Sequence, residues 1–343
     1  MKKTALVLQG GGALGAYQYG AIKGLYEQEQ DFTPSIITGV SIGAINGAVM
    51  LGGKYGPIKS LEKLWNAIKM PAFPLIPQGW QAKAAKFGNP NMYYINPNLM
   101  FSPLTADSVY DITPFQKLLE NLIDFEQLNA HPTKLVIEVV NVETGQLERF
   151  SNQDAEGLSV PKLIASISIP PNFPAVKVNG EYYWDGGLYA NMPLRPAVNH
   201  LRALGGELPD DLIEREVIVI SLFRKNSAVP TTIPQITERI KEIIFESKFD
   251  LDQQLFEKMN EYVDLIREVD QALDKNSKVR QNKVYQQLLN EKKINTPILL
   301  QYVAEGVEGT DDFTPEAMDF RVQQGYFDMI EACKNRLQLK NAG

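Results

Sequence analysis

A serine between two glycines is the first residue whose setting suggests chemistry. Gly39-Val40-Ser41-Ile42-Gly43 follows the apolar run Ile36-Ile37-Thr38 and precedes a stretch of small residues that begins at Ala44. A strand that turns sharply into a helix at such a serine raises the hydroxyl above the sheet and directs the positive helix end at it, as in a nucleophile elbow. Gly39 and Gly43 would supply the small neighbours that this turn requires. The alternative is a serine that only caps the following helix.

A glycine-rich turn near the N-terminus is a second candidate. Residues 4–9 predict a first buried strand, which ends at Gly10-Gly11-Gly12-Ala13-Leu14-Gly15, and a helix follows. Backbone N–H groups of such a turn, together with the helix N-terminus, can hold an anion. That anion is either a dinucleotide pyrophosphate or the oxyanion of an acyl-transfer intermediate. The next strand favours the oxyanion, because it ends in Thr38 and the serine turn where a dinucleotide fold places an acidic residue.

An aspartate at the end of a predicted hairpin is the third candidate. Val176-Lys177-Val178 and Tyr182-Tyr183-Trp184 flank Asn179-Gly180, which is a strong hairpin signal, and the second arm ends in Asp185-Gly186-Gly187. The two glycines free the backbone for close approach by another group. The alternative is an Asx-type turn at the end of a strand.

The elements around these motifs predict an α/β fold. Buried strands are expected at residues 4–9, 36–38, 135–140 and 217–222, the last of these completing the central sheet, with helices between them. Residues 71–114 are rich in proline and aromatic residues, and we interpret them as a loop that either covers an apolar substrate channel or uses its aromatic side chains to anchor itself.

The region beyond residue 225 has a different texture, with long helical stripes and one more expected strand at residues 297–303. We expect these stripes to form core or a dimer seam rather than a membrane surface. The stripe residues are Ile236, Ile240, Ile243, Leu251, Leu255, Met259, Tyr262, Ile266 and Leu273. Cys333 lies in a later apolar stripe and is expected to be a buried apolar residue rather than a nucleophile.

Composition narrows the classes of protein. The chain has 343 residues, 44% hydrophobic and 22% charged, as is typical of globular proteins, and its net charge of −7 argues against nucleic acid as a partner. A single cysteine excludes an internal disulfide and, with only His131 and His200 besides, makes a metal site improbable. The N-terminal apolar run ends at Gly10, too soon for a secretory signal, and no run is long enough to span a membrane. We therefore expect a cytoplasmic protein, with peripheral contact to the inner membrane face open.

Taken in order, the three motifs resemble the patatin-like phospholipases and acyl hydrolases. The resemblance covers roughly the first 225 residues and implies a three-layer α/β hydrolase with a central, mostly parallel sheet over residues 1–225 and a mostly helical C-terminal extension over 226–343. It also implies a Ser-Asp dyad, in which Ser41 matches the nucleophile and Asp185 the acid that takes its proton. Gly10, Gly11 and Gly12 match the oxyanion loop, and the supporting small positions are Gly15, Gly39, Gly43, Gly186 and Gly187. Leu14 departs from the Arg or Lys that the family commonly has, which removes a side-chain cation but leaves the backbone donors.

The resemblance predicts cleavage of lipid acyl esters without a metal or cofactor. The expected partner is a lipid or acyl-ester substrate, and self-association through the C-terminal helices is open. Both histidines fit ordinary turn or capping positions, so no triad is expected. Two other classes remain open: a catalytically silent lipid-binding or scaffold protein, and a dinucleotide-binding oxidoreductase with Glu27, Glu29 or Asp31 near the ribose, which would leave Ser41 and Asp185 without a role.

Overall fold

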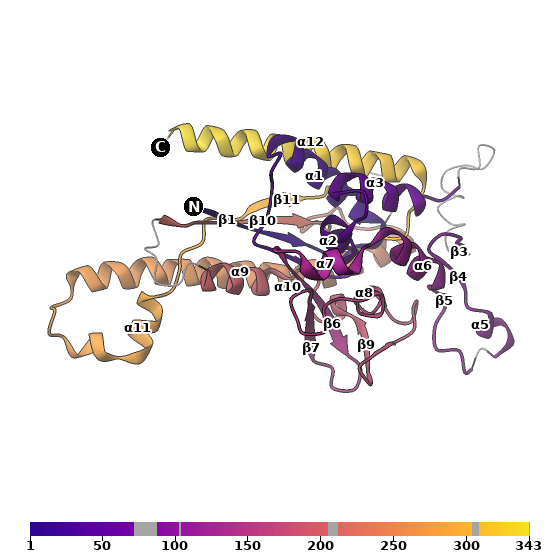
Figure 1. The fold of residues 1–343 in the computed structure, drawn as a ribbon, viewed down its shortest axis with the longest axis horizontal. Coiled ribbons are helices and arrows are strands. Elements are labelled where there is room, and N and C mark those ends of the chain that lie inside the picture. Colours follow the sequence, from indigo (N-terminus) through magenta and orange to yellow (C-terminus); the bar gives the residue numbers. More distant parts are fainter. Residues whose placement is uncertain (72–87, 103, 205–211, 304–308, 343) are drawn as a thin grey trace.

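A central β-sheet forms the middle layer of the molecule (Figure 1). The structure is a computed structural model that describes residues 1–71, 88–102, 104–204, 212–303 and 309–342. The sheet order is β11-β10-β1-β2-β6-β9-β8, and β7 also pairs with β6. The first five strands of this order run parallel, whereas β7 and β9 are antiparallel to β6. The strands are β1 (Lys2–Leu8), β2 (Ile36–Gly39), β6 (Lys134–Asn141), β7 (Leu147–Ser151), β8 (Val176–Val178), β9 (Glu181–Asp185), β10 (Glu214–Ser221) and β11 (Ile298–Gln301).

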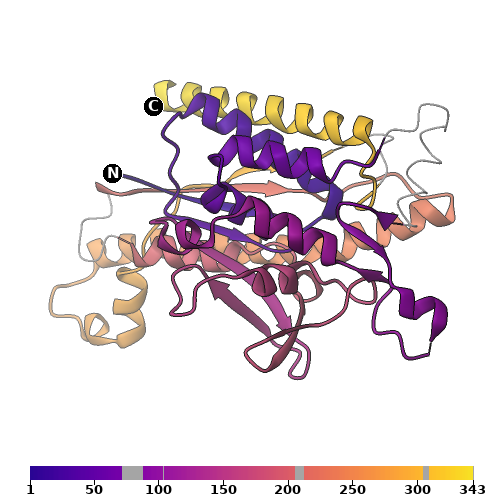
Figure 2. The ribbon, with the colours of Figure 1, turned by 45° about the vertical axis from the view of Figure 1, so that its right-hand side comes forward.

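Helices cover both faces of the sheet, since alternate strand residues bury apolar side chains in opposite directions. Leu6 and Leu8 of β1 join the larger core with α1, α2 and α3, whereas Ala5 and Val7 join a second core with α9 and α10. The helices are α1 (Gly15–Gln28), α2 (Ile42–Gly52), α3 (Pro57–Ala67), α6 (Thr113–Leu122), α7 (Phe125–Ala130), α8 (Val160–Ile167), α9 (Leu194–Ala203), α10 (Ile233–Ala272), α11 (Lys283–Leu289) and α12 (Pro315–Ala342). The predicted three-layer α/β class is therefore confirmed (Figure 2).

The region beyond residue 225 shares the core of the central sheet. β11 extends the sheet by pairing with β10, so the expectation that residues 217–222 form its last strand is wrong. β11 comes from a distant part of the chain, and the sequence of β10 does not indicate that another strand pairs with its outer edge. α12 lies along α1 on the outer side of the sheet, at the top of Figure 1. Residues on both sides of position 225 contribute strands to one sheet. The division of the chain into two domains at this position stays a prediction.

The apolar stripe along α10, expected to form core or a dimer seam, is mostly exposed and does not form core. Ile236, Ile240, Ile243, Leu251, Leu255 and Tyr262 have exposed fractions of 44–63%. The buried line consists instead of Phe249, Phe256 and Val263, at 4%, 6% and 0% exposure, which pack towards the second core. The helix has apolar residues on two faces, and the aromatic face is the one that the sheet covers.

The aromatic stretch at residues 71–114 is only partly described, because residues 72–87 and 103 lie outside the described ranges. The described part contains a small antiparallel sheet and a short helix that stands away from the core on the right of Figure 1. Its elements are β3 (Gly88–Asn89), β4 (Tyr93–Ile95), α5 (Pro97–Phe101) and β5 (Tyr110–Asp111).

Among the described residues, no helix is both long enough and apolar enough to cross a membrane.

Candidate active site

The sheet register brings the serine and the aspartate to one level of the carboxyl edge. Gly39 of β2 lies beside Ile137 of β6. Two residues further along β6, Val139 pairs with Asp185 of β9. Ser41 is also two residues beyond Gly39, so it stands at the same height as Asp185 with one strand between them. Residues far apart in the sequence thus meet because each ends a strand of the same sheet.

Ser41 occupies a strained turn between β2 and α2. Its φ is 53° and its ψ is −130°, in the left-handed half of backbone space that serine rarely adopts. The turn is held by its neighbours: a Cβ at Gly43 would lie 2.3 Å from the carbonyl oxygen of Leu8, and one at Gly39 would lie 2.6 Å from the amide of Ala44. Ser41 also stands at the N-terminus of α2, whose dipole favours negative charge there.

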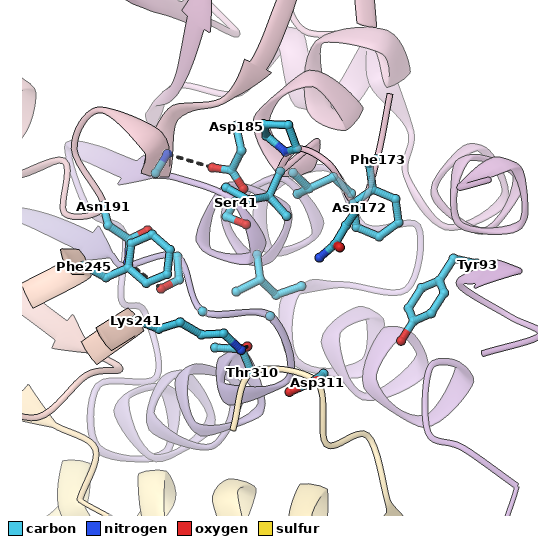
Figure 3. A pocket seen from close by; sticks show the side chains of 18 of the residues that line it. Ser41, Tyr93, Asn172, Phe173, Asp185, Asn191, Lys241, Phe245, Thr310 and Asp311 are labelled. Carbon is cyan, nitrogen blue, oxygen red and sulfur yellow. Dashed lines mark hydrogen bonds between the residues drawn. The ribbon is translucent and has the colours of Figure 1, made fainter. Parts of the chain in front are cut away.

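Asp185 lies buried beside Ser41 at the end of β9 (Figure 3). Its Oδ1 accepts a hydrogen bond of 2.8 Å from the Gly187 N–H, which fixes the carboxylate at the start of a short 3₁₀ turn, Gly186–Leu188. Burial raises the pKa of Asp185 to about 7, while the hydrogen bonds from the Gly187 amide and the Ser41 side chain act in the opposite direction. A carboxyl group with this pKa can accept a proton and return it near neutral pH.

The glycine loop faces Ser41 from the end of β1. A Cβ at Gly10 would lie 2.9 Å from the Cβ of Ser41, so the loop and the serine turn are in close contact. The N–H groups of Gly10 and Ala13 are engaged, and their acceptors are the carbonyl oxygens of Asn191 at 3.3 Å and Thr310 at 2.8 Å. Within the part of the chain that the structure describes, the N–H groups of Gly11 and Gly12 have no hydrogen-bond partner. These two amides are therefore available as donors to an oxyanion.

Gly12 adopts a conformation and a position that only glycine tolerates without a shift. Its φ is +56°, and a Cβ there would lie 2.3 Å from the carbonyl oxygen of Thr310. Arg321 of α12 is fully buried behind the loop and donates to the carbonyl oxygens of Asp312 at 2.6 Å and Ala13 at 3.4 Å. The C-terminal region therefore fixes the outer side of the glycine loop.

Two buried amides tie the ends of the glycine loop together. Gln18 of α1 donates to the carbonyl oxygen of Gln9 at 2.7 Å. Asn46 of α2 donates to the Gln18 side chain at 2.9 Å and to the carbonyl oxygen of Gly15 at 3.1 Å. The indole N–H of Trp65 completes the network at 2.9 Å from Asn46 Oδ1. Since Asn46 is on the helix that begins after Ser41, this network sets the loop relative to the serine.

A cavity of about 510 Å³ opens onto these groups (Figure 3). One wall is aromatic: the rings of Tyr93, Tyr110 and Phe173 lie with centroids 4.8–6.0 Å apart. The opposite wall comes from the C-terminal region, where Lys241 and Phe245 of α10 face Ser41. The cavity therefore combines an apolar interior with a few convergent polar groups, as ligand sites do.

A scan against protein-family models matches residues 6–198 to the model described as "Patatin-like phospholipase". The chain belongs to the patatin-like phospholipase family. The matched range contains all three motifs, and the resemblance predicted from them is confirmed. Membership of the family indicates a lipid-ester hydrolase.

Solved structures of similar fold are distant. VipD from Legionella pneumophila shares 18% identity at a TM-score of 0.38, with 97% of this chain and 67% of that chain covered. A chain of the heterodimeric ExoU–SpcU complex from the type III secretion system of Pseudomonas aeruginosa shares 20% identity at a TM-score of 0.33, with coverages of 71% and 50%. This chain thus spans half to two thirds of the length of those chains. No curated protein sequence matches it.

Leu14 stands where the family commonly has Arg or Lys, and it is buried at 6% exposure within the larger core. An apolar residue at this position suits its surroundings, and the cation among the described pocket residues comes from Lys241 instead. Its ammonium group lies 2.8 Å from the Glu238 carboxylate and 3.4 Å from Thr310 Oγ1.

Neither histidine is among the described residues that line the pocket. His131 caps the end of α7 and accepts a hydrogen bond of 3.1 Å from the Thr133 amide, and His200 lies in the last turn of α9. Two acids considered for a ribose contact are also engaged elsewhere. Glu27 accepts from the Tyr326 hydroxyl, and Glu29 pairs with Lys2 and Arg336.

Sequence reasoning missed two side chains that position the reacting groups. Asn191 donates to the Gly10 carbonyl oxygen at 2.9 Å, and its Oδ1 would lie 2.9 Å from a Cβ at Gly187, so it bridges the glycine loop and the aspartate turn. Ser166 of α8 accepts a hydrogen bond of 3.2 Å from the Ser41 amide. The sequence offered one indication of Asn191, namely its position shortly after Gly186-Gly187. It offered no indication of Ser166.

Proposed function

We propose that the protein hydrolyses lipid esters by a dyad of Ser41 and Asp185. The observation that carries this proposal is the position of Ser41. It lies in a strained turn between a buried carboxyl group with a pKa of about 7 and the two amides of the glycine loop. An idle serine would not require the positive φ or a buried acid beside it.

The reaction follows from these placements. Asp185 takes the hydroxyl proton as Ser41 Oγ attacks the ester carbonyl carbon, and the N–H groups of Gly11 and Gly12 bind the developing oxyanion. The intermediate expels the alcohol, which receives the proton from Asp185, and an acyl-serine remains. Water then attacks the acyl carbon, with Asp185 again as the base, and the acid product leaves as Ser41 is restored.

The cavity supports an acyl substrate. Tyr93, Tyr110 and Phe173 offer an apolar wall on one side of Ser41, which suits a hydrocarbon chain. The described part of residues 71–114 supplies two of these rings, in keeping with the proposed role of this stretch as a substrate wall. We also propose that the protein acts in the cytoplasm, where its buried, unpaired Cys333 would stay reduced.

The test combines a fluorophosphonate probe with a panel of soluble and lipid esters. We expect the wild type to label, and Ser41→Ala to lose labelling and to lower kcat/KM by at least about 10⁴-fold. Ser35→Ala is the matched control, because Ser35 is partly exposed just before the same strand and lies away from the pocket.

A catalytically silent lipid-binding protein is the other outcome. It would leave the wild type unlabelled and without turnover on every ester, and the dyad would then be rejected. If the wild type hydrolysed esters and Ser41→Ala kept full activity, Ser41 would be rejected as the nucleophile.

A further inference from the structure

The most exposed large apolar side chains lie on two segments next to the pocket. Leu104, Val229, Phe101 and Ile233 have exposed fractions of 99%, 86%, 84% and 79%. Phe101 and Leu104 lie at and just after the end of α5, and Val229 and Ile233 lie before and at the start of α10. Figures 1 and 2 both show α5 at the end of the molecule towards which the parallel strands point, and α10 begins at the same end. Water-exposed apolar groups at such a place indicate an interaction surface.

The α5 segment is built as an arm with a fixed base. Asn96 is 8% exposed, and its backbone N–H donates to the carbonyl oxygen of Val109 at 2.9 Å. Its side-chain amide donates to the carbonyl oxygen of Ser108 at 3.2 Å, which closes the loop at its foot. The Val109 amide donates to the carbonyl oxygen of Pro171 at 3.0 Å, and the next residue, Tyr110, lines the pocket. The foot of the arm therefore adjoins the pocket wall, while its apolar tip extends into water.

The start of α10 is fixed in a similar way. Thr232 and Gln235 form a capping box, and Arg239 bonds both Glu242 and the carbonyl oxygen of Lys225, so the helix begins at a defined place. Two turns further on, the same helix puts Lys241 and Phe245 into the pocket. The exposed faces of this half of α10 carry Ile236, Ile240, Ile243 and Ile244, with exposed fractions of 44–54%.

A third contribution comes from the turn that holds Asp185. Leu188 and Tyr189 follow Gly187 directly and are 42% and 46% exposed. The ammonium group of Lys248 lies 4.9 Å from the centroid of the Tyr189 ring and bonds its carbonyl oxygen, which joins this turn to α10. Exposed apolar residues therefore come from three chain segments that each supply a pocket residue.

We infer that this apolar rim, made of Phe101, Leu104, Leu188, Tyr189, Val229, Ile233, Ile236 and Ile240, docks the pocket onto a lipid bilayer. The inference rests on the proposed hydrolysis of lipid esters, because a bilayer is the one occupant that both covers an apolar rim and delivers an acyl chain into the pocket to which the same three segments contribute. The charges nearby favour the same occupant. Lys241 pairs with Glu238 and Arg239 with Glu242, so these four charges near the start of α10 balance one another and do not favour anionic lipid or a charged protein partner.

The test measures flotation with phosphatidylcholine vesicles, using Ser41→Ala protein so that the vesicles stay intact. The rim variant combines Phe101→Gln, Leu104→Gln and Ile233→Gln. We expect the rim variant to bind vesicles at least about tenfold more weakly than the Ser41→Ala protein with its rim unchanged. We expect 0.5 M salt to change the affinity of the latter by no more than about twofold. The matched control combines Leu265→Gln, Val284→Gln and Phe327→Gln, which are 57%, 60% and 64% exposed but lie away from the pocket residues.

With Ser41 in place, the rim variant should hydrolyse a soluble short-chain ester as the wild type does, and should lose activity only on vesicles. Failure of the Ser41→Ala protein with its rim unchanged to float, equal binding by the rim variant, or a parallel loss on the soluble ester would each overturn the inference. So would light scattering that shows a wild-type dimer and a monomeric rim variant, since the rim would then join two copies. Absence of any turnover on the soluble ester would instead reject the proposed function, while flotation still reports on docking.

Discussion

The pocket has two sides of different origin. The motif region supplies Ser41, Asp185 and the glycine loop, all at turns that end strands of the central sheet. The region beyond residue 225 supplies Phe245 from the middle of a helix and Thr310 from an irregular segment, neither in a recognisable motif. The positions of Ser41, Asp185 and the glycine loop depend on local backbone geometry, which a short sequence pattern encodes. The composition of the opposite pocket wall depends on which distant segment packs there. Under the proposed function, the first side performs the chemistry and the second holds the glycine loop in place.

The largest effect should come from the motif side. We expect Asp185→Asn to lower kcat/KM by about 10³–10⁴-fold, because Asn cannot accept the proton of Ser41. In the wild type, kcat/KM should rise with pH and level off above about pH 7, which is the pKa of Asp185 in the enzyme without substrate. Hydrolysis of a soluble ester between pH 5 and pH 9 measures both.

The same substitution should stabilise the fold at high pH. The pKa of Asp185 is about 7 in the folded protein and 3.8 in its ordinary state, so the folded state binds the extra proton between these values. The free energy of unfolding therefore falls as pH rises from about 4 to about 7. Asp185→Asn removes this slope, and we expect it to be roughly 2–4 kcal/mol more stable than the wild type at pH 8, with little difference at pH 4. Glu246, whose pKa burial also raises to about 7, is common to both proteins and cancels in the comparison.

What the sequence could predict follows the same division. The layers, the parallel strands and the family are confirmed, because alternation of buried residues and glycine turns are local patterns. The structure also brings Ser41 beside Asp185, as the order of the motifs predicted, and their catalytic roles stay a proposal. The stripe on α10 does not form core, since periodicity identifies an apolar face but not which of two such faces a sheet will cover, and its role as a dimer seam stays a prediction. Thr310 could not be found, because its contact is made by a carbonyl oxygen, which every residue has.

A smaller effect should come from the contact between the two sides. Gly12→Ala places a Cβ 2.3 Å from the Thr310 carbonyl oxygen at a φ of +56°, so the glycine loop must move. We expect a loss of about 1–3 kcal/mol of stability and about 10- to 100-fold in kcat, because the displaced loop misaligns its amides. Thermal unfolding and turnover on a soluble ester are the measurements.

Gly145→Ala is the matched control for this contact. Gly145 has a φ of +66°, but nothing lies within 4 Å of a Cβ there, and it is far from the pocket residues. It should lose about 1 kcal/mol of stability and no activity. Equal activity of the two variants would mean that the C-terminal region does not hold the glycine loop.

The smallest effect should come from the amides inside the motif side. Asn46→Leu leaves the Gly15 carbonyl oxygen, the Gln18 side chain and the Trp65 N–H without their partner, so we expect a loss of about 1–3 kcal/mol of stability. The loop keeps its other supports, so kcat should fall by only about tenfold or less.

Asn152→Leu separates positioning from stability. Asn152 is buried like Asn46 and bonds four backbone groups, the carbonyl oxygens of Leu128, His131 and Thr133 and the amide of Leu135, and none of these residues lines the pocket. It should lose similar stability with unchanged kcat. If both variants lost kcat equally, the Gln18–Asn46–Trp65 network would only support the fold, and the setting of the glycine loop against Ser41 would depend on Asn191 and Thr310 instead.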